Sequence, residues 1–298
     1  MTFDNTQSKD NSDDFAVVVS NVSHRYGKVI QAIKNVSIAI PKSATIGLVG
    51  PDGVGKSTLL SLIAGMKKIQ TGTVQVLNKD MHNKKAREFL LNKVAFMPQG
   101  LGHNLYPTLS VFENIDFHAR LFSIDKASRQ ARIERLLVAT DLLKFKDRPA
   151  GKLSGGMKQK LSLCCALVHD PDLLILDEPT TGVDPLSRQQ FWRLVDSLRA
   201  ENPSMTVLVS TAYIDEAAQF EYIIAMELLN IAANTFTNQT EVDTPEDFKK
   251  QIEIMTAQLT AMRPQSRDVM DMIDGAYKVI QQSQTLTVSP LRSSNNQR

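Results

Sequence analysis

Cysteine is nearly absent from this chain of 298 residues, and the two that occur, Cys164 and Cys165, are adjacent. Neighbouring cysteines with no further cysteine in the chain build neither a disulfide framework nor a cysteine-based metal site. We therefore expect a reducing, cytoplasmic setting.

Long hydrophobic runs and an excess of charge of one sign are also lacking. No apolar run approaches the roughly 18 residues that a membrane-spanning helix needs, and residues 1–5 lack the basic and apolar regions of a signal peptide. The net charge of +2 is too close to neutral to indicate direct binding to nucleic acid or to an anionic membrane surface. The 42% apolar content predicts a globular protein with a core, acting from outside the lipid if it serves a membrane.

One stretch has a strong chemical signature. Residues 50–57 read Gly-Pro-Asp-Gly-Val-Gly-Lys-Ser and fit the phosphate-loop pattern G-x-x-x-x-G-K-[ST], between an apolar strand-like run at 45–49 and a helical pattern from residue 59. The glycines let backbone N–H groups turn inward toward a polyphosphate at the start of the helix. We expect Lys56 to reach the β- and γ-phosphates and Ser57 to ligate Mg²⁺. The predicted nucleotide-binding residues of this stretch are Gly50, Pro51, Asp52, Gly53, Val54, Gly55, Lys56, Ser57 and Thr58.

The segment before this loop is rich in β-formers. Runs at 17–19, 36–40 and 46–49 are separated by turn residues and predict antiparallel strands that lead into the phosphate loop. Tyr26 falls in a turn context, where its ring could lie against a nucleotide base or pack on a sheet edge.

Polar residues follow two later predicted strands. The run 94–97 ends at Pro98, which leaves Gln99 at a strand terminus, and the buried-type run 173–176 delivers Asp177 and Glu178 at its carboxyl end. Two adjacent carboxylates at such a position indicate a metal-linked role rather than a structural one.

Two further segments have a helical character. From about residue 100 to 152 apolar residues recur at helical spacing, which predicts a helical insertion with its own small core and a surface for a partner. Ser154, followed by Gly155 and Gly156, predicts a helix start whose N–H groups form a second anion site.

The order of these pieces resembles the nucleotide-binding subunits of ATP-binding cassette (ABC) transporters, over about residues 16–227. The resemblance implies an α/β fold: a P-loop NTPase core with an antiparallel β subdomain and an inserted helical subdomain, to which this chain adds a helical C-terminal tail. Residues 97–99 and 105–114 are similar to export-type subunits for drugs or polysaccharides. Residues 50–56 and 209–213 are similar, more narrowly, to the first cassette of the ribosome-associated (YhiH-like) ATPase group.

The resemblance implies a role for each motif. Tyr26 matches the adenine-stacking aromatic, Gln99 the Q-loop glutamine, and Asp177 and Glu178 the Walker B aspartate and the catalytic glutamate. The implied catalytic residues are Glu178, Gln99 and Lys56; the implied Mg²⁺ ligands are Ser57, Gln99 and Asp177. Residues 153–159 match the signature, with Met157 in place of glutamine, and 181–184 match the D-loop.

The resemblance also implies partners. Such subunits close head to tail, as homodimers or heterodimers, so that Ser154, Gly155 and Gly156 of one chain cap the γ-phosphate bound by the other. A separate permease would carry the substrate across the membrane, and the subunit would lie on the inner face of that membrane in the cytoplasm.

Three features depart from the family pattern. Ala212 stands where the family usually has a histidine that contacts the γ-phosphate, and Cys165 stands where arginine is common. Alanine cannot donate a hydrogen bond from its side chain, so slow hydrolysis is expected. After Met226 the glycine turn and closing hairpin of the family are missing.

The expected boundaries follow from these patterns. We predict a disordered lead-in at 1–14, an ABC ATPase domain at 15–227, and a tail at 228–298 with two helices, from about 244 and 266, and a disordered end. The tail would form a helical hairpin or a partner-binding coiled coil. Three functions stay open: an ATPase subunit of a membrane exporter, a soluble or ribosome-associated ABC ATPase, and a degenerate nucleotide-binding module.

Overall fold

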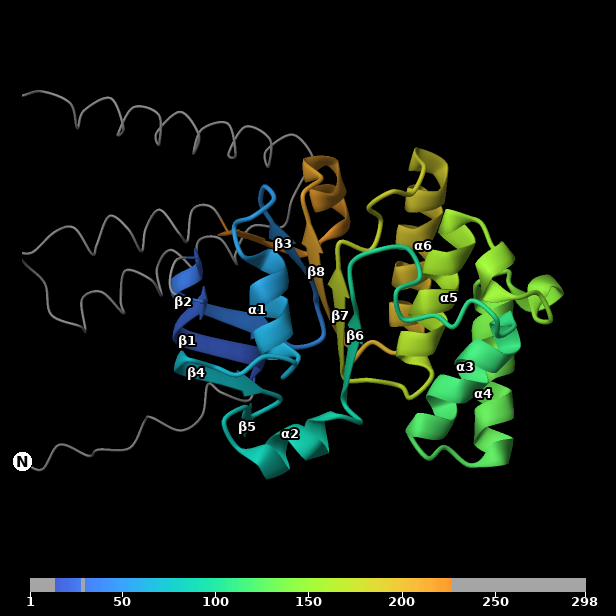
Figure 1. The fold of residues 1–298 in the computed structure, drawn as a ribbon, viewed down its shortest axis with the longest axis horizontal. Helices are drawn as coiled ribbons and strands as arrows, with labels where there is room; N and C mark the ends of the chain where they lie inside the picture. The colour runs from blue at the N-terminus through green and yellow to red at the C-terminus, as the bar shows by residue number, and fades with distance from the viewer. Residues whose placement is uncertain (1–13, 28–29, 227–298) are drawn as a thin grey trace, which may run out of the picture. The chain divides into compact units, whose positions relative to one another are not determined.

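The computed structural model describes residues 14–27 and 30–226. In this part of the chain the strands form two sheets, and helices surround one of them (Figure 1). The predicted lead-in at 1–14, apart from Asp14, and the predicted tail at 228–298 lie outside the described residues.

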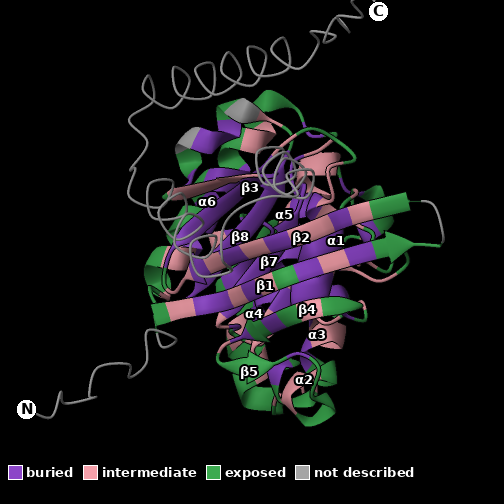
Figure 2. Ribbon diagram, turned by 90° about the vertical axis from the view of Figure 1, so that its left-hand side faces the viewer, coloured by how far each residue is buried: buried purple, intermediate pink, exposed green. Residues whose placement is uncertain are grey.

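One sheet is antiparallel, with the strand order β2-β1-β4-β5. Its strands are β1 (Phe15–Tyr26), β2 (Ile30–Pro41), β4 (Thr71–Val76) and β5 (Lys79–Asp80). Buried and less buried residues alternate along β1 and β2 (Figure 2), because only one face of this sheet packs on the core. A register irregularity between Val19 and Val22 keeps both side chains on the buried face.

The other sheet is parallel, with the order β6-β7-β8-β3-β9. Its strands are β6 (Val94–Met97), β7 (Leu173–Asp177), β8 (Thr206–Thr211), β3 (Thr45–Val49) and β9 (Tyr222–Ala225). Every residue of β3, β7 and β8 is buried, as expected for strands whose two faces are both covered. The prediction that residues 46–49 continue the antiparallel run was wrong: β3 pairs in parallel with β8 and β9, because its uniformly apolar residues suit a doubly covered sheet.

Helices cover the parallel sheet on both faces. Helix α1 (Lys56–Ile63) lies between the two sheets, and α5 (Gly155–Leu167) and α6 (Pro185–Glu201) lie on the opposite face of the parallel sheet (Figure 1). The core is correspondingly divided. One cluster joins α1 to the antiparallel strands, and the other joins the parallel sheet to α5 and α6.

Two helices, α3 (Val111–Leu121) and α4 (Lys126–Ala139), occupy the region where the sequence predicts a helical insertion. Ser110 and Glu113 form a capping box at the start of α3, and Asp125 caps α4. Buried residues of α3 recur at steps of four, at Val111, Ile115 and Ala119. These helices pack against α5 in the second core cluster, at the far side of the molecule from the antiparallel sheet (Figure 1).

Two helices have no counterpart among the sequence predictions. Helix α2 (Lys84–Leu90) begins at Asn83, whose side chain accepts from two backbone N–H groups, but it buries only Leu90 and so lacks a strong apolar period. Helix α6 follows Asp184, which caps it, with Pro185 in its first turn. Only short 3₁₀ segments, among them Ile214–Gln219, occur otherwise between the described helices and strands.

Candidate functional site

The phosphate loop connects β3 to α1, at the carboxyl end of the parallel strands. Gly55 caps α1 at a φ of 100°, and a Cβ there would lie 2.3 Å from the carbonyl oxygen of Ala32. Both the backbone angle and the close approach therefore require glycine at this position. The N–H of Gly50 donates to the carbonyl of Thr211 at 3.3 Å, which fixes the start of the loop to the end of β8.

Lys56 turns its ammonium group back into the loop. Its Nζ donates to the carbonyls of Gly50 at 2.8 Å and Pro51 at 3.0 Å, and lies 3.4 Å from Oε1 of Glu178. The side chain is only 3% exposed, so the positive charge is concentrated inside the loop rather than spread into solvent. Asp52, which is exposed, lies 3.6 Å from the same amine.

Asp177 lies at the end of β7 and accepts hydrogen bonds from two hydroxyl groups. Oδ1 accepts from Ser57 at 2.9 Å and from Ser210 at 2.6 Å. Ser57 belongs to the phosphate loop and Ser210 to β8, so three neighbouring elements meet at one carboxylate oxygen. Hydroxyl and carboxylate oxygens are the donors that Mg²⁺ prefers, and the pair Ser57 and Asp177 fits such an ion.

Glu178 comes next, with a φ of 46° that places a non-glycine residue in the left-handed region. Its N–H donates to both the carbonyl and the hydroxyl of Ser210, which holds this conformation. Oε2 accepts from Nε2 of Gln99 at 2.7 Å and from Thr181 at 3.3 Å, while Oε1 faces Lys56. Backbone strain of this kind is typical of functional sites, and here it aims a buried carboxylate at the phosphate loop.

Gln99, which follows β6, is thus brought to Glu178 as the sequence predicts for residues at strand ends. The contact seen in the structure uses its amide N–H group. Its predicted role as an Mg²⁺ ligand would use the amide oxygen and stays a prediction.

Tyr26 lies at the end of β1 and is 40% exposed. Its hydroxyl is 3.1 Å from Oγ1 of Thr58, the last residue of the predicted nucleotide-binding stretch. The Lys67 ammonium lies 5.0 Å from the ring centroid, and the His24 ring meets it edge to face. The ring is therefore beside the phosphate loop and exposed, which suits a nucleotide base better than simple edge packing.

The predicted second anion site lies at the start of α5. Ser154 caps the helix and accepts from the N–H of Met157, so this serine uses one of the N–H groups that the sequence predicts to be free. The nearest side chains to Gly155 and Gly156 are Leu101 and Ser187, respectively. Within one chain, this segment therefore packs against the loop that follows β6 and against the first turn of α6.

The D-loop leads from β7 into α6. The hydrogen bonds from Ser187 hold the pKa of the Asp184 carboxyl below its usual value, so the cap is charged at neutral pH. A Cβ on Gly156 would lie 2.9 Å from the Ser187 side chain, so the start of α6 approaches the start of α5 closely at this glycine.

Ala212 follows β8 and is exposed. Its neighbour Thr211 is buried, and the Tyr213 ring lies 4.1 Å from the Arg188 guanidinium. The loop therefore presents no hydrogen-bonding side chain at position 212.

Three residues of the site were missed by sequence reasoning. Ser210 could have been found, since it interrupts the apolar run 207–209 with a hydroxyl at the carboxyl end of a strand. Thr180 and Glu216 have no local signal. They are recognised only because the fold buries both and brings the Thr180 hydroxyl to the Glu216 carboxylate, on the loop that follows Glu178.

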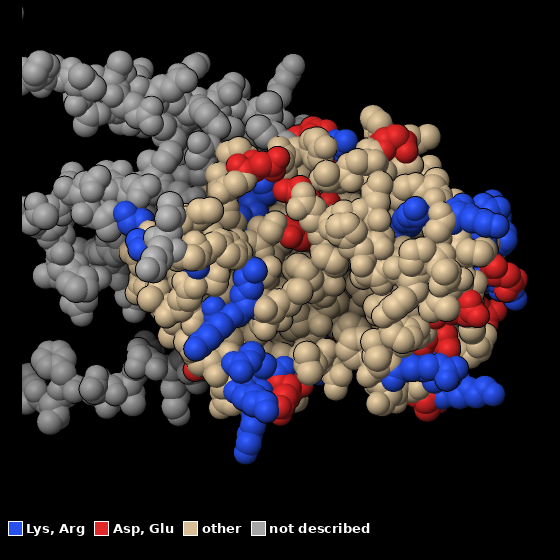
Figure 3. Space-filling view, in the orientation of Figure 1, with Lys and Arg blue, Asp and Glu red and all other residues tan. Residues whose placement is uncertain are grey.

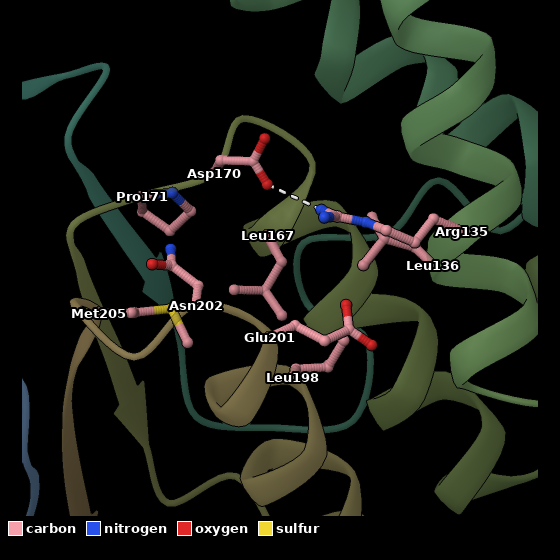
Figure 4. Close-up of a pocket in the computed structure, with 9 residues that line it drawn as sticks. All are labelled: Arg135, Leu136, Leu167, Asp170, Pro171, Leu198, Glu201, Asn202 and Met205. Carbon is pink, nitrogen blue, oxygen red and sulfur yellow. Dashed lines mark hydrogen bonds and ion pairs between the residues drawn. The ribbon is translucent and has the colours of Figure 1, made fainter.

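A small cavity lies away from this site, between α4, α5 and α6 (Figure 4). Its volume is about 30 Å³, and Leu136, Leu167 and Met205 line it together with an ion pair of Arg135 and Asp170. This is the space of about one water molecule, so it holds no nucleotide.

Cys164 and Cys165 are buried free thiols on α5, and burial raises the pKa of Cys164 to about 12.

The arrangement has the parts that phosphoryl transfer to water needs: a buried cation, a loop of N–H groups, oxygen donors for a divalent ion and a carboxylate facing them. In the part of the chain that the structure describes, none of the helices is apolar and long enough to span a bilayer.

Comparison with known proteins agrees with this chemistry. The family model described as "ABC transporter" matches residues 33–181. The chain is 41% identical over 215 residues to the probable multidrug ABC transporter ATP-binding protein YbhF of Escherichia coli, covering 72% of this chain and 36% of YbhF. It is 31% identical over 273 residues to the doxorubicin resistance ATP-binding protein DrrA of Mycobacterium tuberculosis, covering 87% of this chain and 79% of DrrA. The chain thus spans about a third of the length of YbhF.

Two solved structures share the fold. CbiO1 of Clostridium perfringens, described as part of the ABC transporter complex cbiONQ, gives a TM-score of 0.65 at 26% identity, over 72% of this chain and 86% of cbiO1. The ATP-binding cassette MJ0796, in a dimeric post-hydrolysis state with ADP and phosphate, gives 0.62 at 28% identity, over 70% of this chain and 93% of that protein.

Proposed function

This chain belongs to the ABC transporter family, and from that premise we propose that it binds and hydrolyses ATP as the nucleotide-binding subunit of a membrane exporter. The observation that carries the proposal is the cluster of Lys56, Ser57, Asp177 and Glu178 at the carboxyl ends of β3 and β7. Relatives named as a multidrug ABC transporter ATP-binding protein and a doxorubicin resistance ATP-binding protein support the exporter class.

Each residue of the cluster has a part in the reaction. Lys56 and the N–H groups of residues 50–58 bind the phosphates, and Tyr26 stacks on the adenine. Ser57 and Asp177 hold Mg²⁺, with Gln99 as a further ligand; when bound, this ion neutralises charge on the phosphates. Glu178 positions a water and takes its proton.

The ion pair between Lys56 and Glu178 gives the site an order of events. Both side chains are less than a tenth exposed, and their opposite charges stabilise each other. A phosphate that enters the loop takes over Lys56 as its partner. Glu178 keeps Gln99 at 2.7 Å and Thr181 at 3.3 Å, so its carboxylate stays aimed at the site when the lysine moves to the phosphate.

A second copy, or a related cassette, completes the site. Ser154, Gly155 and Gly156 of the partner cap the γ-phosphate in a head-to-tail dimer. The exposed Ser154 at the start of α5 is available for this role, since its side chain makes only a long cap of 3.4 Å to Met157.

A groove beside α2 is our candidate for the permease contact. Its volume is about 330 Å³, and Ala64, Leu90, Leu91 and Val94 provide its apolar lining. Leu91 is 66% exposed, and Lys84, Arg87 and Glu88 are the charged residues of the lining. In the space-filling view, basic side chains gather together with acidic ones at the lower end of the molecule, over the region of α2 (Figure 3). Exposed apolar area with a mainly basic rim fits a cytoplasmic helix of the permease that has apolar anchors and an acidic flank. Such a contact would hold the subunit at the inner face of the membrane.

Co-expression with a permease encoded beside its gene tests this contact. Leu91→Asp should abolish copurification, whereas Val138→Asp, an exposed apolar position on α4, should not. Equal copurification of both variants would place the permease elsewhere.

The hydrolysis itself is tested by steady-state ATPase assays on the purified chain. Glu178→Gln should abolish turnover while retaining ATP binding, and Lys56→Ala should lose ATP affinity and turnover together, because the phosphates lose their cation. Glu201→Gln, an exposed carboxylate at the end of α6, is the matched control. Unchanged ATP affinity of Lys56→Ala by calorimetry would contradict the assignment of the phosphate loop.

Ala212 favours a second candidate, a module that binds ATP tightly and turns it over slowly. Its exposed methyl group cannot donate to a γ-phosphate, so one stabilising contact is absent. The resemblance of residues 50–56 and 209–213 to the ribosome-associated group makes a soluble ATPase a further alternative. Copurification with ribosomes instead of a permease would favour it.

A further inference from the structure

Glu216 is a buried carboxylate that the proposed chemistry does not use. It lies in the 3₁₀ segment Ile214–Gln219 after β8 and is 3% exposed. Burying a carboxylate costs free energy unless hydrogen bonds or charges compensate for the lost water. The contacts of Glu216 therefore decide what its charge is for.

Three donors from three elements converge on this side chain. Oε1 accepts from Oγ1 of Thr180 at 2.5 Å and from Nε1 of Trp192 at 3.1 Å, and Oε2 accepts from Oγ1 of Thr211 at 2.7 Å. The Arg188 guanidinium supplies the nearest described positive charge, with its Nε 3.9 Å from Oε1. Arg188 is also 3.8 Å from the exposed Asp215.

The three donors lie at functional junctions. Thr180 is two residues beyond Glu178, on the loop whose Thr181 hydroxyl bonds the Glu178 carboxylate. Thr211 ends β8, where its carbonyl accepts the N–H of Gly50, the first residue of the phosphate loop. Trp192 belongs to α6, the helix that follows the D-loop. One carboxylate thus ties the loop carrying Glu178 to the strand end that holds the phosphate loop.

We propose that Glu216 is a positioning residue for ATP hydrolysis, a role that rests on the proposed function. By accepting from Thr180 and Thr211 together, it fixes the distance between the loop of Glu178 and the start of the phosphate loop. A displacement of about 1 Å between reacting groups is enough to cost roughly 100-fold in rate. A buried carboxylate adds little stability over an apolar side chain of the same volume, so its value here lies in geometry.

The structure also explains why this anchor matters at position 212. Ala212 follows Thr211 directly and has no side chain with which to fasten its loop to a phosphate. Tyr213 donates its N–H to Oγ1 of Thr211 at 3.0 Å, so the hydroxyl that bonds Glu216 also orders the next turn. The buried Glu216 therefore holds this loop through Thr211, in place of a side chain at position 212 that would contact the nucleotide.

The test is Glu216→Gln, which keeps the size of the side chain and removes its charge. We expect kcat to fall about 10- to 100-fold, with ATP affinity changed by less than about threefold, because the start of the phosphate loop is still held by the backbone hydrogen bond from Gly50 to Thr211. Thr180→Val removes a single donor with little change of shape, and remains informative if Glu216→Gln does not fold. It should lower kcat in the same way, and the double mutant should show less than the product of the two losses.

Asp116→Asn is the matched control. Asp116 on α3 is a partly buried carboxylate with two partners, Arg120 and Arg129, and it lies in the helical region. It should leave kcat unchanged even if it lowers the melting temperature. A loss of kcat in Asp116→Asn equal to that in Glu216→Gln would make the effect one of general stability and overturn the proposal.

Two further outcomes separate this proposal from the function on which it rests. A wild-type chain that is no faster than Glu178→Gln overturns both. An active wild type whose kcat is matched by Glu216→Gln and by Thr180→Val overturns only the positioning role.

Discussion

At the scale of single residues, the proposed chemistry depends on which side chains of the site carry hydrogen-bonding groups. Ala212 ends at its Cβ where the family has a hydrogen-bond donor, whereas Glu178 keeps Gln99, Thr181 and Lys56 around its carboxylate.

Tyr26→Ala should weaken ATP binding by about 1–3 kcal/mol, because a base would lose its aromatic face. Tyr26→Phe is the matched control: it keeps the ring and removes only the hydroxyl contact to Thr58, so most of the affinity should remain. Isothermal titration calorimetry measures both. Equal affinity in wild type and Tyr26→Ala would assign the ring to packing on the sheet edge.

Ala212→His should raise turnover of the purified chain. One missing donor to developing charge typically costs about 10²- to 10³-fold, and the new imidazole would extend from the exposed turn after β8. Adding Glu178→Gln should remove the gain, because the water again lacks its base. A fast wild type that Ala212→His leaves unchanged would mean that another group neutralises the γ-phosphate.

At the scale of elements, helix ends and their contacts link the helical region to the parallel sheet. Phe122 caps the C-terminus of α3, and its ring stacks on His169, just beyond α5, with centroids 3.8 Å apart and planes 12° apart. Burial lowers the pKa of His169 to about 4, so the fold holds a neutral imidazole there. Burial also lowers the pKa of His118 on α3.

This contact predicts an acid-sensitive stability. The unfolded chain takes up a proton as the pH falls through about 6.5, whereas the folded chain does so only near 4, so stability falls with decreasing pH between these values. Between pH 7.5 and 5, protonation linked to His169 should lower the free energy of unfolding by about 2 kcal/mol. Urea unfolding at pH 7.5 and 5 should show a smaller difference for His169→Phe than for wild type. An unchanged difference would mean that His118 or carboxylates carry the effect, and His103→Gln controls for the loss of an exposed histidine.

At the scale of the whole molecule, the two halves of the proposed site lie on different faces of the parallel sheet. The phosphate loop leads into α1, which lies between the sheets, whereas Ser154 caps the start of α5 on the opposite face of the parallel sheet (Figure 1). The proposed head-to-tail pair would bring two such halves together across an interface.

The pairing predicts an ATP-dependent dimer. Glu178→Gln with ATP and Mg²⁺ should dimerise, since ATP is bound but not cleaved, and light scattering after size exclusion measures the mass. Adding Ser154→Arg should return the protein to monomers by placing a bulky cation at the start of α5, with Ser197→Arg on the exposed side of α6 as the control. A monomeric Glu178→Gln at saturating ATP would show that a different cassette is the partner.

The sequence by itself determined the parts whose signal is local. The glycines and Lys56 of residues 50–58 and the apolar run ending at Asp177 identify their elements, because backbone freedom, side-chain chemistry and burial period are properties of a short stretch. Ser154 and Asp177 were placed correctly at a helix start and a strand end for the same reason.

Only the tertiary structure decided which elements meet. Residues 45–49 pair in parallel with β8, with Thr45 opposite Val207, and not with the antiparallel strands that precede them in the chain. No local pattern encodes a partner so distant in the chain. Helix α2 escaped prediction because it buries a single leucine. Glu216 is one acidic residue among many in the sequence, and it becomes part of the site because folding removes its water and brings Thr180, Trp192 and Thr211 to its carboxylate.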